Sequence, residues 1–364
     1  MKISQKTIDQ IFETVILEDV ISDFVVLKKS GANYKGLSPF NDEKTPSFVV
    51  SPSKEIWKDF SSGKGGNVIS FLMDHEQYTY PQALLFLAKK YNIEVEYIEL
   101  DPEAQKEHDE REATLIVLNF AKNTFCATLL EGGSIATSYL KKRGFNNDII
   151  KKFELGYVPF GNHKLVLETK KSGYNVKYLH NARIINNQEK NRFHGRLIFP
   201  IHNITGRVVG FGGRVLDTKQ KAVKYLNSDS SELYQKSKIL YGIHLAKKHI
   251  KLLDSCFIVE GYTDVMAFVQ FGIKNVVSNC GTALTREQIR LIKRFTNNIT
   301  LVFDSDKAGV LATIKAIDLI LEQNMIPQVL KLPKDEDPAS FIQKNSTDVI
   351  NEYINKHKTR FIEE

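Results

Sequence analysis

The chain has 364 residues, 42% hydrophobic and 26% charged, a balance typical of globular proteins with two or three domains. No apolar run approaches the roughly 20 residues that cross a bilayer, and the N-terminus lacks the apolar core of a secretory signal, so we expect no membrane partner. Three isolated cysteines, Cys126, Cys256 and Cys280, exclude a disulfide framework and suit a reducing cytoplasm.

Positive charge is concentrated in the middle of the chain. Residues 1–100 carry a net charge of −3, residues 121–250 carry +15, and the whole chain carries +7. A basic middle is expected of a surface that binds a polyanion such as nucleic acid. A solvated face with extra lysines would leave the same pattern, so charge alone does not decide between the two.

The first block, residues 1–100, opens with apolar residues at helical spacing: Ile8, Ile11, Phe12 and Val15. A turn-rich stretch over 34–66 precedes two helical segments, 68–73 and 83–90. Residues 101–113 are polar and charged, so they form a linker or the solvated start of a long helix. We place a domain boundary there.

Helical and strand-like segments are mixed over residues 114–250, the second block. Its predicted helices cover 115–130 and 138–143, and its predicted strands cover 196–201 and 207–213 with a turn between them. Apolar runs and amphipathic helices then alternate regularly to residue 340, which predicts a parallel sheet covered by helices. Residues 341–364 are predicted to be helical. The fold class is therefore α/β within a chain that is α+β overall.

Acidic residues stand at the ends of two predicted parallel strands, where ligands gather in such sheets. Glu260 ends one strand, Asp304 ends another, and Asp306 follows two residues later. Side chains two apart on an extended backbone point to the same side, so the two aspartates can converge on one cation. Carboxylates and substrate phosphates are the ligands that Mg²⁺ takes. The alternative is that acids at strand ends cap helices, and we expect this of Asp264. Asp264 is also a further possible metal ligand.

Residues 260–265, EGYTDV, and residues 303–309, FDSDKAG, resemble the Toprim domain shared by DnaG-type primases, topoisomerases and some nucleases. The resemblance implies an acid/base role for Glu260 and metal binding by Asp304 and Asp306, with Glu260 also in the metal centre. Residues 332–342, LPKDEDPASFI, resemble a primase segment that carries two further acids. Asp337 matches the first, whereas Ala339 replaces the second, and Ser340, Asp335 or Glu336 are candidates to compensate.

Upstream segments resemble the primase RNA-polymerase core: 143–145, 155–159, 196–201, 206–216, 224–228 and 239–243. The resemblance covers about residues 1–345 and implies a polyanion groove lined by Arg143, Arg196, Arg214, Lys224 and Lys236. Two glycines, Gly212 and Gly213, would let backbone approach a phosphate closely. Tyr225 would stack a base of single-stranded template or be a half-buried strand aromatic, and the sequence does not separate these.

Residues 34–73 resemble the zinc-binding domain of these primases, but the residues that match its metal ligands are Ser38, Asn41, Asp59 and Ser62. Structural zinc depends on thiolates and imidazoles, so we predict that zinc is absent. Losing such a metal removes up to ~10 kcal/mol of folding free energy. We expect hydrogen bonds at the old ligand positions to compensate, together with an aromatic cluster of Phe40, Phe48, Trp57, Phe60 and Phe71.

These observations predict a primase that makes short RNA primers on single-stranded DNA from ribonucleoside triphosphates, with Mg²⁺ or Mn²⁺. We expect a monomer in the cytoplasm, at the replication fork of the nucleoid. Family members also carry a domain that binds the replicative helicase, which nothing in this sequence matches, so a fragment or a shortened relative is expected. The alternatives are another Toprim phosphotransferase, nuclease- or topoisomerase-like, and a single-stranded-DNA-binding protein with weakened catalysis.

Overall fold

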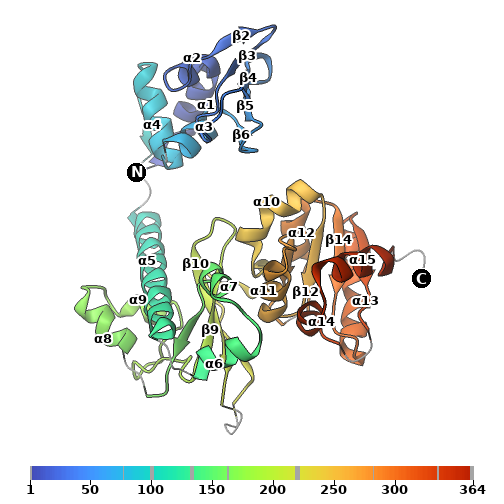
Figure 1. The fold of residues 1–364 in the computed structure, drawn as a ribbon. Helices are drawn as coiled ribbons and strands as arrows, with labels where there is room; N and C mark the ends of the chain where they lie inside the picture. The colour runs from blue at the N-terminus through green and yellow to red at the C-terminus, as the bar shows by residue number, and fades with distance from the viewer. Residues whose placement is uncertain are drawn as a thin grey trace. The chain divides into compact units, whose positions relative to one another are not determined.

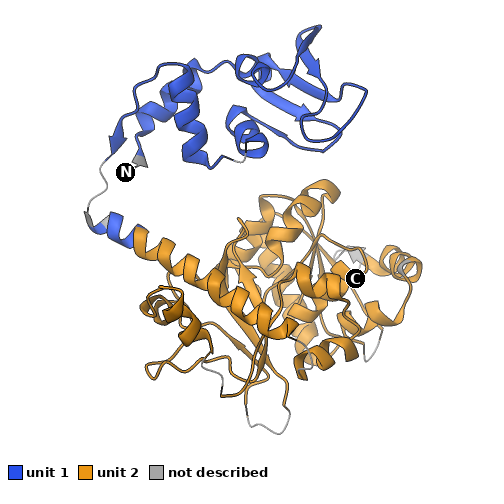
Figure 2. Ribbon diagram, turned by 60° about the vertical axis from the view of Figure 1, so that its left-hand side comes forward, with its two compact units in different colours: residues 1–108 blue, residues 109–364 orange. Residues whose placement is uncertain are grey.

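The computed structural model describes residues 2–76, 78–98, 102–131, 135–161, 164–217, 222–281, 283–333 and 336–360. It divides into two compact units, residues 1–108 and 109–364 (Figure 2). Each unit has its own buried apolar core, as expected of domains.

Unit 1 combines an antiparallel sheet with four helices, α1 Gln5–Thr14, α2 Leu17–Ser22, α3 Val68–His75 and α4 Tyr80–Lys90. The sheet has the order β2-β3-β4-β5-β6, and its strands are Lys28–Ser30, Asn33–Gly36, Phe48–Ser51, Ile56–Asp59 and Gly65–Gly66. A separate pair joins β1 (Lys2–Ile3) to β7 (Tyr97–Ile98). An antiparallel sheet of this kind is zinc-ribbon-like, which agrees with the resemblance of residues 34–73 to a zinc-binding domain.

Four aromatic rings form the centre of unit 1. The Trp57 ring stacks on Phe40 and on Phe48 with centroids 5.5 Å apart in both pairs, and Phe71 meets it edge-on at 5.6 Å. Such pairs add to the free energy gained by burying the rings. Phe60 is 69% exposed, so its inclusion in the predicted cluster was wrong.

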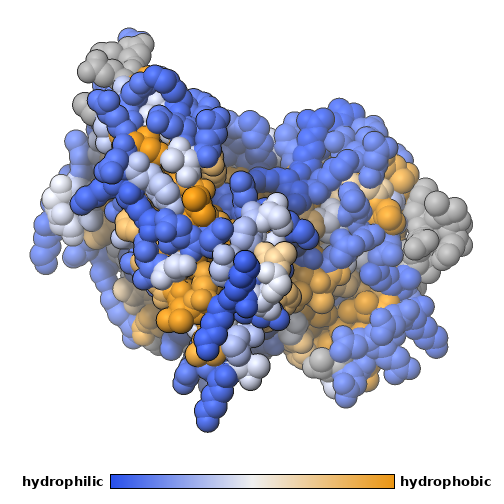
Figure 3. Space-filling model, turned by 90° about the horizontal axis from the view of Figure 1, so that it is seen from above, coloured by the Kyte–Doolittle hydropathy of each residue, from blue (hydrophilic) through white to orange (hydrophobic). Residues whose placement is uncertain are grey.

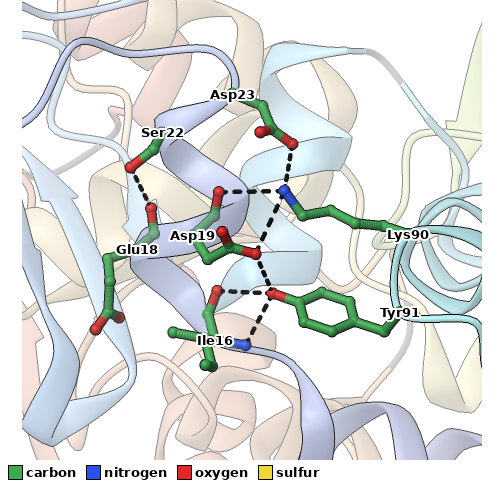
Figure 4. Close-up of polar contacts among 7 residues, drawn as sticks. All are labelled: Ile16, Glu18, Asp19, Ser22, Asp23, Lys90 and Tyr91. Carbon is green, nitrogen blue, oxygen red and sulfur yellow. Dashed lines mark hydrogen bonds and ion pairs between the residues drawn. The ribbon is translucent and has the colours of Figure 1, made fainter.

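A polar network joins α2 to the C-terminal end of α4 in unit 1 (Figure 4). The Lys90 ammonium donates to Asp23 Oδ2 at 2.6 Å, and the Tyr91 hydroxyl donates to Asp19 Oδ2 at 2.7 Å. The same hydroxyl accepts from the Ile16 backbone N–H at 3.2 Å. The network joins segments more than 60 residues apart, which fixes both helices over the shared core.

Helix α5 (Pro102–Leu130) is continuous, so residues 102–113 are the start of a long helix. By length and composition alone, residues 105–130 could cross a membrane, although we had found no apolar run of that kind. Half of its most apolar window is buried, with Val117, Leu118 and Ala121 at most 1% exposed. A core-facing stripe therefore accounts for its apolar residues.

The face drawn in Figure 3 is largely hydrophilic, with apolar side chains in a few patches.

The first part of unit 2 is built on an antiparallel sheet with the order β11-β10-β9-β8. Its strands are Tyr225–Asn227, Val208–Val215, Arg196–His202 and Gly156–Val158. Short helices surround it: α6 Ile135–Lys142, α7 Asn147–Lys152, α8 Lys164–Lys171 and α9 Lys177–Asn181. The predicted hairpin of residues 196–213 is confirmed as β9 and β10.

The second part of unit 2 is a sheet with the order β13-β12-β14-β15-β16. Its four parallel strands are Val276–Ser278, Cys256–Val259, Asn298–Val302 and Ile326–Leu330. One face packs on helices α10 Ile243–Leu253, α12 Arg286–Lys293 and α13 Lys307–Glu322. The other packs on α11 Tyr262–Gln270, α14 Pro338–Lys344 and α15 Thr347–His357. Neighbouring strand residues Ile258 and Val259 enter opposite cores, which confirms the predicted sheet covered by helices (Figure 1).

The C-terminal segment differs from the prediction in two ways. Helix α14 begins at Pro338, before the predicted boundary at residue 341. The predicted helix over residues 341–364 was also wrong at Lys358–Arg360, which form strand β16 and pair antiparallel with β15. Residues 361–364 lie outside the described residues. Helical periodicity in α15 does not reveal a strand of three residues whose partner lies about 30 residues earlier.

Candidate active site

Two parallel strands deliver acids to one pocket. Strand β12 ends at Val259 and β14 ends at Val302, in register with each other, so Glu260 and Asp304 leave the same edge of the sheet. The Asp304 backbone N–H donates to Glu260 Oε1 at 3.1 Å. Both line a pocket of about 330 Å³.

Burial and mutual repulsion act on the acids of this pocket. Burial raises the pKa of Glu260, and the charges of Asp304 and Asp306 raise it further, against the hydrogen bond from the Asp304 N–H. Burial likewise raises the pKa of Asp304, with Asp337 and Asp306 adding to the effect and Lys224 opposing it. A divalent cation relieves such a concentration of negative charge.

Asp306 has a role that the spacing argument missed. It is the N-cap of α13, and its Oδ1 accepts from the Gly309 N–H at 2.8 Å. Its side chain is exposed and does not line the pocket, although its charge acts on Glu260 and Asp304. The capping alternative therefore describes Asp306 in this structure, and its role as a metal ligand stays a prediction.

Gly309 allows the first turn of α13 to pack against the strand end that carries Asp304. A Cβ at this position would lie 2.1 Å from the Asp304 carbonyl oxygen. We expect Gly309→Ala to displace Asp304, to destabilise unit 2 by about 1–3 kcal/mol and to abolish its catalysis. Thermal unfolding and an activity assay check this, with the exposed neighbour change Ala308→Ser as control. A Gly309→Ala protein that matches the wild type in both would contradict this packing.

Four carboxylates line the pocket: Glu260, Asp264, Asp304 and Asp337. Asp337 caps α14 by accepting from the Ser340 N–H at 2.7 Å. Ala339 is buried, 2% exposed, beside it. Ser340 and Glu336 bond to each other at 2.5 Å, and Glu336 also pairs with Lys344, so neither replaces the missing acid. The remaining candidate, Asp335, lies outside the described residues.

Asp264 lies in the third position of α11 rather than at its start, and its Oδ2 accepts from the Gly261 N–H at 2.9 Å. The prediction that it caps this helix is confirmed in that form. Burial raises the pKa of Asp264 to about 7, and Asp337, Asp304 and Glu260 add to the shift. Among the described residues, no three acidic, histidine or cysteine side chains are arranged to hold an ion.

Four of the five predicted groove cations line the same pocket: Arg143, Arg214, Lys224 and Lys236. Arg196 does not. It is 7% exposed and donates from one nitrogen to the carbonyls of Gly213 at 3.1 Å and Val223 at 2.9 Å. Burial lowers its pKa. Its prediction as a groove residue was wrong, because a buried arginine here joins β9 to the backbone of its neighbours.

Side-chain packing requires a glycine at both positions 212 and 213. A Cβ on Gly212 would lie 2.5 Å from the Tyr262 ring, and one on Gly213 would lie 2.6 Å from Phe193. Tyr262 in turn donates to Asn227 Oδ1 at 2.6 Å, and both residues line the pocket. We missed them, although each lies within a quoted motif, because their place in the pocket depends on contact between the two sheets.

The loop that carries Arg143 is held by the helix that carries Asp264. Gln270 of α11 accepts from the Asn146 N–H at 3.0 Å and donates to the Gly144 carbonyl at 2.9 Å. Arg143 is thereby fixed across the boundary between the two parts of unit 2. Tyr225 lines the pocket from β11 and is half-buried against the core, which agrees with the half-buried strand aromatic. Its stacking on a base stays a prediction.

In unit 1, the predicted zinc-ligand positions lie together. Ser38 Oγ donates to Asp59 Oδ2 at 2.9 Å, the Ser62 hydroxyl also donates to this carboxylate, and the Asn41 N–H donates to Ser38 Oγ at 3.1 Å. Asp59 is fully buried. One carboxylate, two hydroxyls and an amide do not fit tetrahedral structural zinc, which takes thiolate and imidazole ligands. A hydrogen-bond network occupies the place of the metal.

Family models match three parts of the chain: "CHC2 zinc finger" over residues 3–102, "DNA primase catalytic core, N-terminal domain" over 125–247, and "Toprim-like" over 257–342. The DNA primase of Clostridium acetobutylicum is 36% identical over 94% of this chain and 57% of its own length. That of Staphylococcus epidermidis is 35% identical over all of this chain and 62% of its own. The chain thus spans about three-fifths of the relatives it matches.

Solved structures agree. The crystal structure of the zinc-binding and RNA-polymerase domains of Aquifex aeolicus primase has 33% identity and a TM-score of 0.66, over 98% of this chain and 86% of that one. A DnaG primase catalytic domain bound to single-stranded DNA has 30% identity and a TM-score of 0.62, over 69% and 80%. The parallel sheet with its acidic edge therefore places the chain among the Toprim proteins. With its basic antiparallel sheet and ribbon-like unit, it belongs to the DnaG-type primase family.

Proposed function

We propose that this chain is a DNA-directed RNA polymerase that makes short RNA primers on single-stranded DNA. The observation that carries the proposal is one pocket in which the carboxylates of Glu260, Asp304 and Asp337 face Arg143, Arg214, Lys224 and Lys236. Nucleotidyl transfer needs both charges. The acids would hold a divalent cation, and the arginines and lysines would hold the phosphates of nucleotide and template.

Glu260, Asp304 and Asp337 are the candidates to hold Mg²⁺ or Mn²⁺. One or two of them with substrate phosphates would suffice, because among the described residues no three acids form a preformed site. Asp264 also lines the pocket, and the charge of Asp306 acts on Glu260 and Asp304. The bound ion supplies activation of the attacking 3′-hydroxyl and neutralisation of the leaving pyrophosphate. Burial raises the pKa of Glu260, which makes it a stronger base than an ordinary carboxylate and suits a group that accepts the hydroxyl proton. Lys224 and Lys236 orient the triphosphate, while Tyr225 offers an aromatic face to a base.

The proposed substrates are ribonucleoside triphosphates and a single-stranded DNA template, and the proposed product is an RNA primer. Support for the template comes from the similar DnaG catalytic domain that was solved with single-stranded DNA. We place the protein in the cytoplasm at the nucleoid. The monomeric state and any contact with a replicative helicase stay predictions.

Incubation of the chain with single-stranded DNA, labelled ribonucleotides and Mg²⁺ or Mn²⁺ tests the proposal. We expect oligoribonucleotides that depend on both template and metal. Strand cleavage or relaxation without RNA synthesis would favour another Toprim activity. DNA binding without either reaction would favour a protein with lost catalysis, the alternative that the buried Ala339 motivates.

A further inference from the structure

Tyr139 on α6 lies against two arginines of the active-site pocket without lining the pocket itself. The guanidinium carbon of Arg214 lies 4.8 Å from the centroid of its ring, and that of Arg143 lies 5.8 Å from it. The negative face of an aromatic ring attracts a cation at these distances. One ring therefore contacts both arginines of the pocket.

Arg214 is held from a second side by Tyr225. The two residues are directly opposite each other on β10 and β11, and the Arg214 guanidinium carbon lies 5.1 Å from the Tyr225 ring centroid. The guanidinium also donates to the Tyr225 hydroxyl at 2.5 Å. Contacts with two rings and one hydroxyl leave few conformations to the arginine side chain.

These arginines share the pocket with Glu260, Asp304 and Asp337, yet no ion pair joins either arginine to these acids within the described parts of the chain. A long, flexible arginine next to clustered carboxylates would ordinarily pair with one of them. The contacts with the aromatic rings oppose the formation of such an ion pair. Both guanidinium groups keep donors available for a ligand with negative charge.

The ring itself is fixed by the core. Its helical neighbours Ala136 and Leu140 are fully buried, and Tyr139 packs half-buried against the same cluster. Burial raises the pKa of its hydroxyl, so the ring stays neutral at physiological pH, and the charges of Arg214 and Arg143 act in the opposite direction.

We propose that Tyr139 is a positioning residue that holds Arg143 and Arg214 in the conformation that binds phosphate groups. A guanidinium that is already oriented loses less side-chain entropy when it forms its paired hydrogen bonds to phosphate oxygens. The inference rests on the proposed function for the source of these phosphates, which is either a nucleoside triphosphate or the template backbone.

Binding measurements on the full chain separate the two sources. The probes are inorganic tripolyphosphate, followed by calorimetry, and a fluorescent single-stranded DNA oligonucleotide, followed by anisotropy. We expect Tyr139→Leu to weaken binding about tenfold and to reduce its salt dependence. We expect Tyr139→Phe, which keeps the ring, to stay within about threefold of the wild type.

Tyr178→Leu is the matched control. Tyr178 is also half-buried against this core and also has a cation over its ring, Lys177 Nζ at 4.8 Å, but Lys177 does not line the pocket, whereas Arg143 and Arg214 do. Both leucine variants lose similar packing, so a similar fall in unfolding temperature is expected. A loss of phosphate binding that is confined to Tyr139→Leu then reports arginine positioning.

Weakened binding of tripolyphosphate alone assigns the arginines to the triphosphate, and weakened binding of DNA alone assigns them to the template. Either result supports the inference. Unchanged binding of both probes by Tyr139→Leu, or an equal loss in Tyr139→Phe, overturns it. Because binding is measured without catalysis, the test is independent of the proposed function. A wild-type protein that makes no primers would overturn the proposed function but not the positioning role of Tyr139.

Discussion

Asp304→Asn is expected to lower primer synthesis by at least about 10²–10³-fold while leaving the fold intact. The amide keeps the shape of the side chain but removes a charge from the acidic edge where β12 and β14 end. Burial raises the pKa of Asp304, with Asp337 and Asp306 adding to it, so its ionised form is unfavourable in the metal-free fold. We therefore expect the unfolding temperature of the variant to equal or exceed that of the wild type.

A second readout does not depend on activity. Mg²⁺ or Mn²⁺ should raise the unfolding temperature of the wild type, because a ligand that binds only the native state stabilises it. Asp304→Asn should lose most of that increase. Asp318→Asn, an exposed acid on helix α13, which follows Asp304 in the chain, is the control and should keep both activity and the metal effect. An Asp304→Asn protein that still makes primers would remove Asp304 from the active site.

Asp59→Ala is expected to destabilise unit 1 by about 3 kcal/mol or more. The buried carboxylate accepts hydrogen bonds from the hydroxyls of Ser38, Ser47, Ser61 and Ser62 and from the Ser62 N–H. Alanine would leave these donors without their acceptor. Trp57 is the only tryptophan of the chain and stacks in the core of unit 1, so its fluorescence during urea unfolding reports this unit alone.

The pH dependence of this effect has a defined sign. Burial by itself would raise the pKa of Asp59, but hydrogen bonds from Ser62, Ser38 and Ser61 outweigh it and hold the pKa below the ordinary value. A carboxyl with a depressed pKa stabilises the fold above its unfolded pKa of about 3.9, and this stability is lost as pH falls through the folded pKa. The difference between wild type and Asp59→Ala should therefore shrink below about pH 4.

Metal dependence distinguishes this network from a zinc site. We expect a zinc chelator to leave the Trp57 transition unchanged, and the exposed control Asp42→Ala to unfold like the wild type. Stoichiometric zinc in protein purified without added metal, or a transition that shifts with the chelator, would contradict a metal-free unit 1.

Sequence patterns predicted what depends on local periodicity and on strand order. Side chains on one face repeat every two residues in a strand and about every four in a helix. These repeats predicted the hairpin of β9 and β10 and the alternating strands and helices after residue 255, and the structure contains both. Glu260 and Asp304 were placed together because parallel strands end at one edge of a sheet.

The errors have two other causes: contacts between distant segments, and a local change of backbone conformation. Arg196 was predicted to face the groove, but it turns to the carbonyls of Gly213 and Val223 across its own sheet. Because side chains two apart on a strand point to the same side, Asp306 was predicted to lie beside Asp304. The chain leaves the strand conformation after Val302, however, and Asp306 caps α13. No local pattern in α6 marks Tyr139, whose role arises from Arg214 some 75 residues later.

Strand β16 also determines how the parallel sheet meets its surroundings. Without residues 358–360, β15 would be an edge strand with a free row of backbone donors and acceptors, a template for pairing with another chain. Its antiparallel pairing with residues 328–330 occupies that row. Removal of residues 358–360 should therefore promote self-association of otherwise folded protein through the exposed edge of β15, without affecting the chemistry of the pocket.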